Sequence, residues 1–425
     1  MNEIIKAIIK SNLFFINRNK ILLFVYTCSF LQAFTIQGQN QNAWEKPYIG
    51  SDVTLLYYPD QNANYFRYAW ESKPGLEIIV KGKMPEARYF SFNLYDDYHK
   101  SSIEALSDVQ ILPDEADPSA YTIHITRNSS MERKRNTIVV PDSVRLLSLF
   151  LRYYLARIDP FANVPLPTIQ MVVNGVNIAT AASIPLPAMS TADMANLRNL
   201  VAAQPKFLTN AEKKKLASNK YTVSEKEPLI SKLLTMPIFR HFSNPDTISA
   251  YNFMSDGNYP NKDNHYIVMP VLRQKKSVLL VRFKAPSHGL KLGDITSDVR
   301  YYSLSQGNEY TNTSLTMHDE QLKISSDGFV YVLVASESEE LKSTAANLGI
   351  NFMPWLYKDR LVLILRHMLP SKNFKSSTAE VPVFQRAKPA KGQEAELTIG
   401  DFALKGKFIK TKEWKAVKNL DQLRF

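Results

Sequence analysis

Cysteine is almost absent from this chain. Its 425 residues include one cysteine, Cys28, which lies inside an apolar run at residues 21–34. The chain after that run therefore has no thiol, which excludes disulfide bonds, a thiol nucleophile and a thiolate metal site there. A chain of this length buries enough apolar surface to fold without disulfides, even in an oxidising compartment.

Glycine is also scarce, with 14 residues in the whole chain. The sequence has no glycine-rich phosphate loop, no G-x-S-x-G nucleophile elbow, no H-E-x-x-H zinc motif and no twelve-residue calcium loop. The commonest sequence-local catalytic and metal motifs are therefore excluded. A Ser-His-Asp triad stays open, because its members need not be close in sequence.

Beyond residue 38, no apolar run approaches the length of a membrane span. Before it, four basic residues precede the run at 21–34, and the small residue Gly38 follows. A basic start, a short apolar core and a small exit residue are typical of a secretory signal peptide. We therefore expect residues 1–38 to be removed and the protein to be secreted or periplasmic. The main alternative is an uncleaved anchor.

The remaining sequence is rich in aromatic residues, with 21 Tyr and 22 Phe, which favour strands. Short apolar runs alternate with proline- and glycine-containing turns, a pattern typical of sandwiches and barrels. The sequence therefore predicts a mainly β protein.

Arg-Tyr-Phe-Ser at residue 88 returns as Arg-Tyr-Tyr-Ser at residue 300. Each copy is followed by a second arginine in an apolar strand, Arg152 after 64 residues and Arg366 after 66 residues. Such self-similarity indicates that one module has been used twice. We predict two related antiparallel β-sandwich modules.

The first copy of the repeat alternates along its strand. Arg88, Phe90, Phe92 and Leu94 fall on one face, which should enter the core. The other face is polar and aromatic, and a ligand or another sheet could use it: Tyr89, Ser91, Asn93 and Tyr95.

Changes in composition divide the chain into five parts. After the signal peptide, residues 39–186 form the first module, 187–238 a helical connection and 239–385 the second module with its preceding loop. Residues 386–425 form a basic tail, in which ten basic residues face five acidic ones. Residues 397–399 could add a late strand there, with the rest as a loose arm.

The loop at 239–266 carries more titratable groups than a connector needs, and the crevice between modules is a common ligand site. We therefore expect a site where the loop meets the repeated strands, with these ligand-binding residues: Arg88, Tyr89, Asn93, Arg300, Tyr301, His241, Asp263 and His265. We expect no cofactor, although His241, Asp246, Asp256, Asp263 and His265 leave a divalent cation open.

Each of these groups also has a structural interpretation. The arginines could form buried salt bridges with carboxylates such as Asp96 or Asp298. The loop could instead cover a sheet edge with its polar groups in solvent. His124 and His367 lie within strands and fit packed histidines better than bases.

The motifs together resemble a family of uncharacterised secreted bacterial proteins. They are residues 58–60, 87–96, 136–138 and 166–169 in the first half, with 259–266, 299–304, Trp355 and 365–370 in the second. The resemblance implies a two-module β architecture and an exported location but no reaction. Members of the family often carry a cysteine pair after the second Arg-Tyr motif. This chain has Ser305 and Ser314 near those places, so that disulfide is absent.

The formal net charge of +12 and the pI of about 9.4 favour an anionic partner. Export makes nucleic acid a poor candidate, whereas an anionic glycan or cell-surface molecule suits a basic exported protein. We therefore predict a non-catalytic binding protein. The alternative is an enzyme on anionic polysaccharide, lyase or hydrolase, in which Arg neutralises a carboxylate and Tyr or His moves a proton. A generic basic surface also stays open, and the sequence does not predict the oligomeric state.

Overall fold

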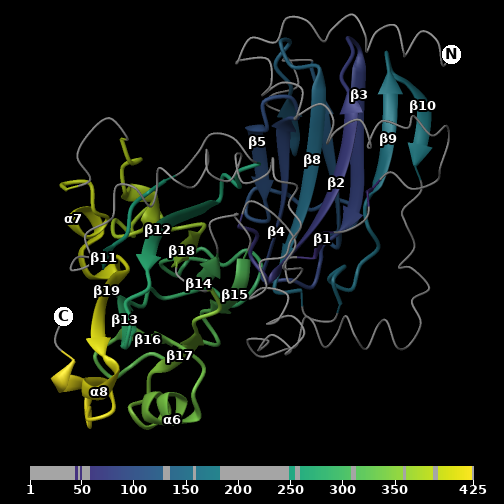
Figure 1. Ribbon diagram of the computed structural model, residues 1–425. Helices are drawn as coiled ribbons and strands as arrows, with labels where there is room; N and C mark the ends of the chain where they lie inside the picture. The colour runs from purple at the N-terminus through teal and green to yellow at the C-terminus, as the bar shows by residue number, and fades with distance from the viewer. Residues whose placement is uncertain are drawn as a thin grey trace, which may run out of the picture. The chain divides into compact units, whose positions relative to one another are not determined.

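The computed structural model describes residues 44–45, 48–49, 58–127, 135–156, 159–181, 248–253, 259–307, 313–357, 360–385 and 391–423. These residues form four β-sheets, two in each half of the chain (Figure 1). The prediction of a mainly β protein is confirmed. The expected signal peptide and helical connection lie outside the described residues, as do His241, Asp246 and Asp256 of the loop.

The first module contains two five-stranded sheets. One has the order β1 (Tyr48–Ile49), β2 (Ala63–Glu71), β8 (Leu146–Tyr154), β4 (Tyr89–Asp96) and β5 (Ser101–Ser107). The other has the order β10 (Val176–Ala181), β9 (Thr168–Val173), β3 (Leu76–Lys83), β6 (Ala120–Thr126) and β7 (Thr137–Val139).

The second module contains a five-stranded and a four-stranded sheet. The larger one has the order β11 (Ile248–Ser249), β19 (Lys405–Lys410), β13 (Ser277–Lys284), β16 (Phe329–Ala335) and β17 (Asn351–Pro354). The smaller one has the order β12 (Asn264–Leu272), β18 (Arg360–Met368), β14 (Tyr301–Gly307) and β15 (Thr313–His318).

The two modules share one topology. The order β2-β8-β4-β5 corresponds to β12-β18-β14-β15, and β9-β3-β6-β7 corresponds to β19-β13-β16-β17. Each module also has one parallel pair at the same place, β6–β7 and β16–β17, in otherwise antiparallel sheets. Within the repeat, Arg152 pairs with Ser91 and Arg366 pairs with Ser303, at the same step of the ladder. This agreement in order and register supports the internal repeat inferred from the sequence.

Each module has its own apolar core between its two sheets. In the first, Phe90 and Phe92 of β4 pack in one cluster with Ile123 of β6. In the second, Leu304 of β14 packs in one cluster with Val332 of β16. These contacts confirm the predicted inward face of the first repeated strand and the sandwich character of both modules. The outward faces of β4 and β14 are also buried, which indicates a second contact.

A helix crosses between the parallel strands of the second module, because parallel neighbours require a long connection. This helix, α6 (Glu339–Asn347), begins at Ser338, whose side chain accepts a hydrogen bond from the backbone N–H of Leu341. It buries Leu341 and Ala345 against the outer side of the larger sheet. The second module therefore has three layers where α6 lies.

The basic C-terminal segment belongs to the second module. Its strand β19 lies between β11 and β13, so the module extends well beyond residue 385. The expected strand at 397–399 is wrong, since these residues lie in the short helix α7 (Glu396–Ile399). Further on, α8 (Thr411–Trp414) buries Trp414 completely against the same apolar cluster as α6. An ordered strand and a buried tryptophan also replace the expected loose arm.

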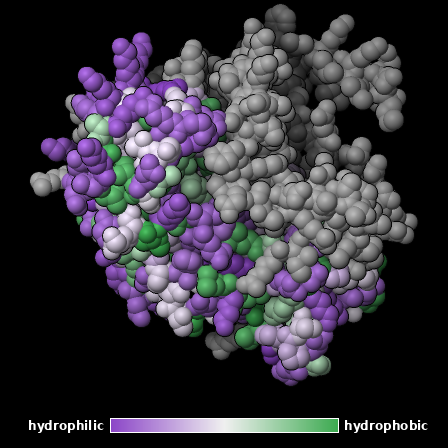
Figure 2. All heavy atoms as spheres, turned by 90° about the horizontal axis from the view of Figure 1, so that it is seen from below, coloured by the Kyte–Doolittle hydropathy of each residue, from purple (hydrophilic) through white to green (hydrophobic). Residues whose placement is uncertain are grey.

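Among the described residues, no helix is long and apolar enough to span a membrane. Figure 2 shows one face of the molecule, on which hydrophilic residues predominate and hydrophobic residues form small separate patches.

The burial of Trp414 leads to a test of the C-terminal segment. Trp414→Ala should lower the free energy of unfolding by about 3–5 kcal/mol, because it opens a large cavity in the core. Leu397→Ala is the control, since Leu397 is 68% exposed, and should change it by less than about 0.5 kcal/mol. Urea unfolding of both variants measures the difference. Equal stabilities would contradict the placement of residues 411–414 in the core.

Candidate functional site

The modules meet through two similar loops, one before β2 and one before β12. The first reads Tyr-Pro-Asp-Gln-Asn from residue 58, and the second reads Tyr-Pro-Asn-Lys-Asp from residue 259. Tyr58 and Tyr259 both have a positive φ, 50° and 57°. A left-handed tyrosine at the same step of both loops requires specific support from its surroundings.

Each module's second arginine supplies that support to the other module's loop. The Nη2 of Arg366 donates a hydrogen bond of 2.6 Å to the carbonyl oxygen of Tyr58. The Nη2 of Arg152 donates one of 3.2 Å to the carbonyl oxygen of Tyr259. Both guanidinium groups are buried, so these bonds form away from solvent.

The repeated tyrosines also bind the loop of the other module. The Tyr89 hydroxyl donates to the Asp263 carboxylate at 2.6 Å. The Tyr301 hydroxyl donates to the Asp60 carboxylate at 2.9 Å, and it accepts a bond from Asn62. Each tyrosine therefore projects from the outward face of its own sheet and binds the loop of the other module.

The first arginine of each module likewise binds a carboxylate of the other module. Arg88 forms an ion pair of 2.5 Å with Asp319, which follows β15, and contacts Glu320. Arg300 forms an ion pair of 2.5 Å with Asp108, which follows β5. Asp108 and Asp319 are equivalent in the repeat, since each follows the strand that pairs with β4 or β14. The structural interpretation of these arginines holds, but the partners are carboxylates of the other module rather than Asp96 or Asp298.

These contacts have approximate two-fold symmetry. Three kinds of contact run in both directions: second arginine to loop carbonyl, tyrosine to loop carboxylate, and first arginine to the carboxylate after β15 or β5. The interface of a symmetric dimer has the same character. The apolar centre obeys the same rule, with Tyr89 and Tyr154 from one module against Tyr301 and Met368 from the other. The outward faces of β4 and β14 are buried because each meets the other module.

Burial controls the ionisation of the groups in this contact. It raises the pKa of the Tyr89 hydroxyl well above its usual value, and the charge of Asp263 adds to the effect. Burial likewise raises the pKa of the Tyr301 hydroxyl, with a contribution from Asp60. Both phenols therefore stay protonated and act as hydrogen-bond donors.

The two equivalent carboxylates differ. Burial raises the pKa of Asp108 above its usual value, and the Arg300 charge offsets this only in part. Burial also acts on Asp319, but the hydrogen bond from His318 and the charge of Arg88 outweigh it and lower the pKa. The charged form of Asp319 is therefore more strongly stabilised than that of Asp108.

Five of the eight predicted site residues lie in this contact: Arg88, Tyr89, Arg300, Tyr301 and Asp263. Asn93 is fully buried beside them and donates a hydrogen bond to Ser91. His265 is placed elsewhere, because strand alternation turns it to the opposite face of β12 from Tyr266. The structure thus brings the loop and the repeated strands together but separates His265 from them.

Sequence reasoning missed the acidic partners Asp60, Asp108 and Asp319. The signal for Asp60 was present, since residues 58–60 repeat the pattern of residues 259–261. Asp108 and Asp319 share only a short pattern, Asp-x-Gln at residues 108–110 and 319–321. The shared strand order shows that the two aspartates are equivalent.

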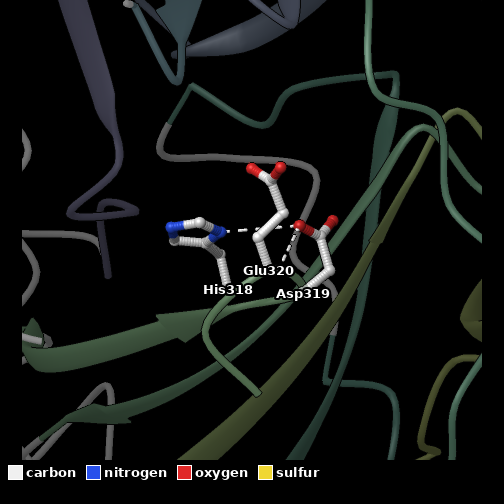
Figure 3. A group of neighbouring side chains, drawn as sticks. All are labelled: His318, Asp319 and Glu320. Atoms are coloured by element: carbon white, nitrogen blue, oxygen red, sulfur yellow. Dashed lines mark hydrogen bonds and ion pairs between the residues drawn. The ribbon is translucent and has the colours of Figure 1, made fainter. Parts of the chain in front are cut away.

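Across the described part of the chain, one group of His, Asp and Glu side chains could hold a metal ion. It consists of His318, Asp319 and Glu320 at the end of β15, whose ligand atoms lie within 4.8 Å of one another (Figure 3). Arg88 already binds both carboxylates, and its fixed positive charge opposes a cation there. The group is better explained as the acidic half of an ion-pair cluster.

His367 lies on the core side of β18. It is fully buried, and its Nδ1 accepts a hydrogen bond of 3.2 Å from the backbone N–H of Thr378. Burial lowers the pKa of His367 to about 3, and His265 across the strand pair adds to the effect. The ring is therefore neutral and packed, as the sequence indicated.

Comparison with known proteins supports the fold alone. No protein-family profile and no curated protein matches the chain. An uncharacterised protein from Burkholderia cenocepacia is similar in structure, with a TM-score of 0.50 and 12% identity, over 91% of this chain and 86% of that one. A Vibrio parahaemolyticus protein gives a TM-score of 0.37 and 13% identity, over 82% of this chain and 92% of its own.

The exchanged ion pairs lead to a stability test. Asp108→Asn should lower the free energy of unfolding by about 3 kcal/mol, because it leaves the buried Arg300 guanidinium without its counter-charge. Asp117→Asn is the matched control, since it breaks the solvent-exposed Lys83–Asp117 pair and should change stability little. Chemical denaturation at pH 7 measures both. A small effect of Asp108→Asn would show that the pair does not hold the modules together.

The buried histidine leads to a pH test. Since its pKa is lower in the folded protein than in the unfolded chain, His367 contributes stability above about pH 6.5 that is lost as the pH falls toward 3. One such group accounts for up to about 3 kcal/mol between pH 6.5 and pH 4. His367→Asn retains an acceptor for Thr378 but does not titrate, so its unfolding free energy should vary less over this range. Identical pH profiles would contradict the assignment.

Proposed function

We propose that the protein is an exported, non-catalytic binding protein for anionic glycans or other anionic surface molecules. The repeated Arg and Tyr side chains are occupied by partners in the other module, which leaves their donors little capacity for a ligand. Ligand contact is then most accessible at the rim of the inter-module contact, where the turn between β4 and β5 lies against the second loop.

An exposed aromatic side chain on this turn carries the proposal. Tyr98 is 70% exposed, a large value for a tyrosine, and its ring contacts only the edge of His99 among the aromatic groups described. Such a ring offers a flat apolar surface on which a sugar ring could stack. The position suits recognition better than folding.

The same turn carries a cation, Lys100. Lys100 Nζ donates a hydrogen bond of 3.1 Å to the hydroxyl of Tyr259, which in turn donates to Asp97 at 2.6 Å. These bonds fix the turn to the second loop and hold the Lys100 charge at Tyr259, on the turn that carries Tyr98. A fixed cation and an exposed aromatic ring on one turn suit an acidic sugar.

The alternative of an enzyme on anionic polysaccharide has less support. The tyrosine that could move a proton, Tyr89, has a pKa raised well above its usual value, which opposes its action as a base at neutral pH. Its hydroxyl is also engaged by Asp263.

The proposal predicts that mature protein binds a polyuronate and that Tyr98→Ala weakens binding about tenfold, as expected for the loss of one stacking contact. The melting temperature should change little, because the ring is exposed. Ile295→Ala, at a residue 73% exposed in the second module, is the matched control and should bind normally.

Titration calorimetry against acidic and neutral glycans, with ultraviolet absorbance recorded in parallel, is the measurement. Formation of ultraviolet-absorbing products would favour the enzyme. Equal affinity of Tyr98→Ala and the parent protein would place binding elsewhere.

A further inference from the structure

Two positions in the loops break the symmetry between the two modules. Asp60 in the first loop corresponds to Asn261 in the second, and Asn62 corresponds to Asp263. The acid and the amide have thus changed places between the two copies. This exchange alters what each second arginine meets.

In one half of the contact, the arginine has a carboxylate. Asp60 Oδ2 lies 3.8 Å from Arg366 Nη1 and accepts hydrogen bonds of 2.9 Å from both Tyr301 and Ser303. The Arg366 Nη1 also donates to Ser305. The charge and the donors of this half are therefore satisfied within the chain.

In the other half, no carboxylate of the described residues lies within ion-pair distance of the arginine, although Asp263 is near enough to feel its charge. Arg152 is 3% exposed, and none of the ion pairs among the described residues involves it. Its Nη2 binds the Tyr259 carbonyl and the Tyr95 hydroxyl also interacts with the guanidinium, but Nη1 itself has no acceptor in hydrogen-bond geometry. The carboxylate of the second loop, Asp263, accepts from Tyr89 instead. A buried guanidinium donor without an acceptor is costly, so this half is incomplete.

A second unsatisfied group lies on the same face of the sheet. Ser91 of β4 is directly opposite Arg152 of β8, and Asn93 is the next residue on that face. Asn93 Nδ2 donates to Ser91, while its buried Oδ1 has no partner. Rotation of the amide would let the Ser91 hydroxyl donate to Oδ1 and leave the Asn93 N–H groups free as donors. Arg152 and Asn93 would then both present donors.

We propose that Arg152, Ser91 and Asn93 form a buried site for a small monovalent carboxylate such as formate, which takes the place that Asp60 fills in the other half. The ligand accepts hydrogen bonds from Arg152 and Asn93 and supplies the missing negative charge. A single water molecule could satisfy these hydrogen bonds but not the charge. The rings of Tyr65, Tyr95 and Phe150, each 5.4–5.7 Å from the guanidinium, restrict the site to a small anion. This site is independent of the glycan contact at Tyr98.

The repeat itself supplies the decisive variant. Asn261→Asp with Asp263→Asn gives the second loop the acid and amide order of the first, so the chain provides its own carboxylate for Arg152. Arg152→Gln removes the charge that attracts the anion and serves as the second variant. The converse pair, Asp60→Asn with Asn62→Asp, should create a second site beside Arg366.

The melting temperature is measured from 1 to 100 mM formate, with formate replacing the bulkier methanesulfonate at constant ionic strength. The parent protein should gain about 2 °C or more, and the converse pair should gain more than the parent. The Asn261→Asp/Asp263→Asn variant and Arg152→Gln should gain less than a quarter of the parent's shift. No shift in the parent, or equal shifts in all variants that fold, overturns the proposal.

A crystal structure of the parent protein grown in formate is the direct test. Planar density within hydrogen-bond distance of Arg152 Nη1 is the expected result. One water molecule bridging Arg152 and Asn93, or a closed contact between them, would overturn the proposal even if every variant failed to fold.

Discussion

Four buried arginines, each bound by the other module, determine how the two halves of this protein fit together. A guanidinium group is expensive to remove from water, and it is tolerated only where carboxylates and carbonyl oxygens replace its hydration. Here Arg88 and Arg300 take carboxylates that follow β15 and β5, while Arg152 and Arg366 take the carbonyl oxygens of two left-handed tyrosines. Neither module alone provides the partners that its buried arginines need. The contact therefore favours one register over any other, since a shift would leave several buried charges unpaired.

This dependence explains a feature that is unusual for a half-buried antiparallel sheet. The outward face of β4 carries Tyr89, Ser91, Asn93 and Tyr95, and all four are fully buried. Such a face, with its polar groups, could not form a core without hydrogen-bond partners. The loop from the other module supplies them, with Asp263 for Tyr89 and the Pro260 carbonyl for Tyr95. The directional hydrogen bonds of these polar aromatic faces therefore fix the position of one module on the other. A purely apolar face would allow several positions.

Much of this architecture could be predicted from the sequence. The repeat of Arg-Tyr and of the second arginine gave the two modules, and alternation gave the core face of β4, because both depend on local order in the chain. Partner choice could not be predicted, since nearest acids such as Asp96 and Asp298 bind His99 and a backbone N–H instead. Pairing across modules depends on the three-dimensional contact. The tail was misjudged for a similar reason: the expected loose arm contains β19, whose pairing with β13 depends on a contact far away in the sequence.

Duplication also indicates where function could arise in such a molecule. In two copies joined through equivalent faces, a difference between the copies shows which polar group one half has and the other lacks. The exchange of acid and amide between residues 60–62 and 261–263 is such a difference. It preserves the hydrogen bond from Tyr89, because Asp263 replaces the acceptor two residues further on. It does not give Arg152 an ion pair like the one between Arg366 and Asp60. An interface that once had only a structural role can acquire a binding site in this way, since the donors are already ordered and desolvated before any ligand arrives.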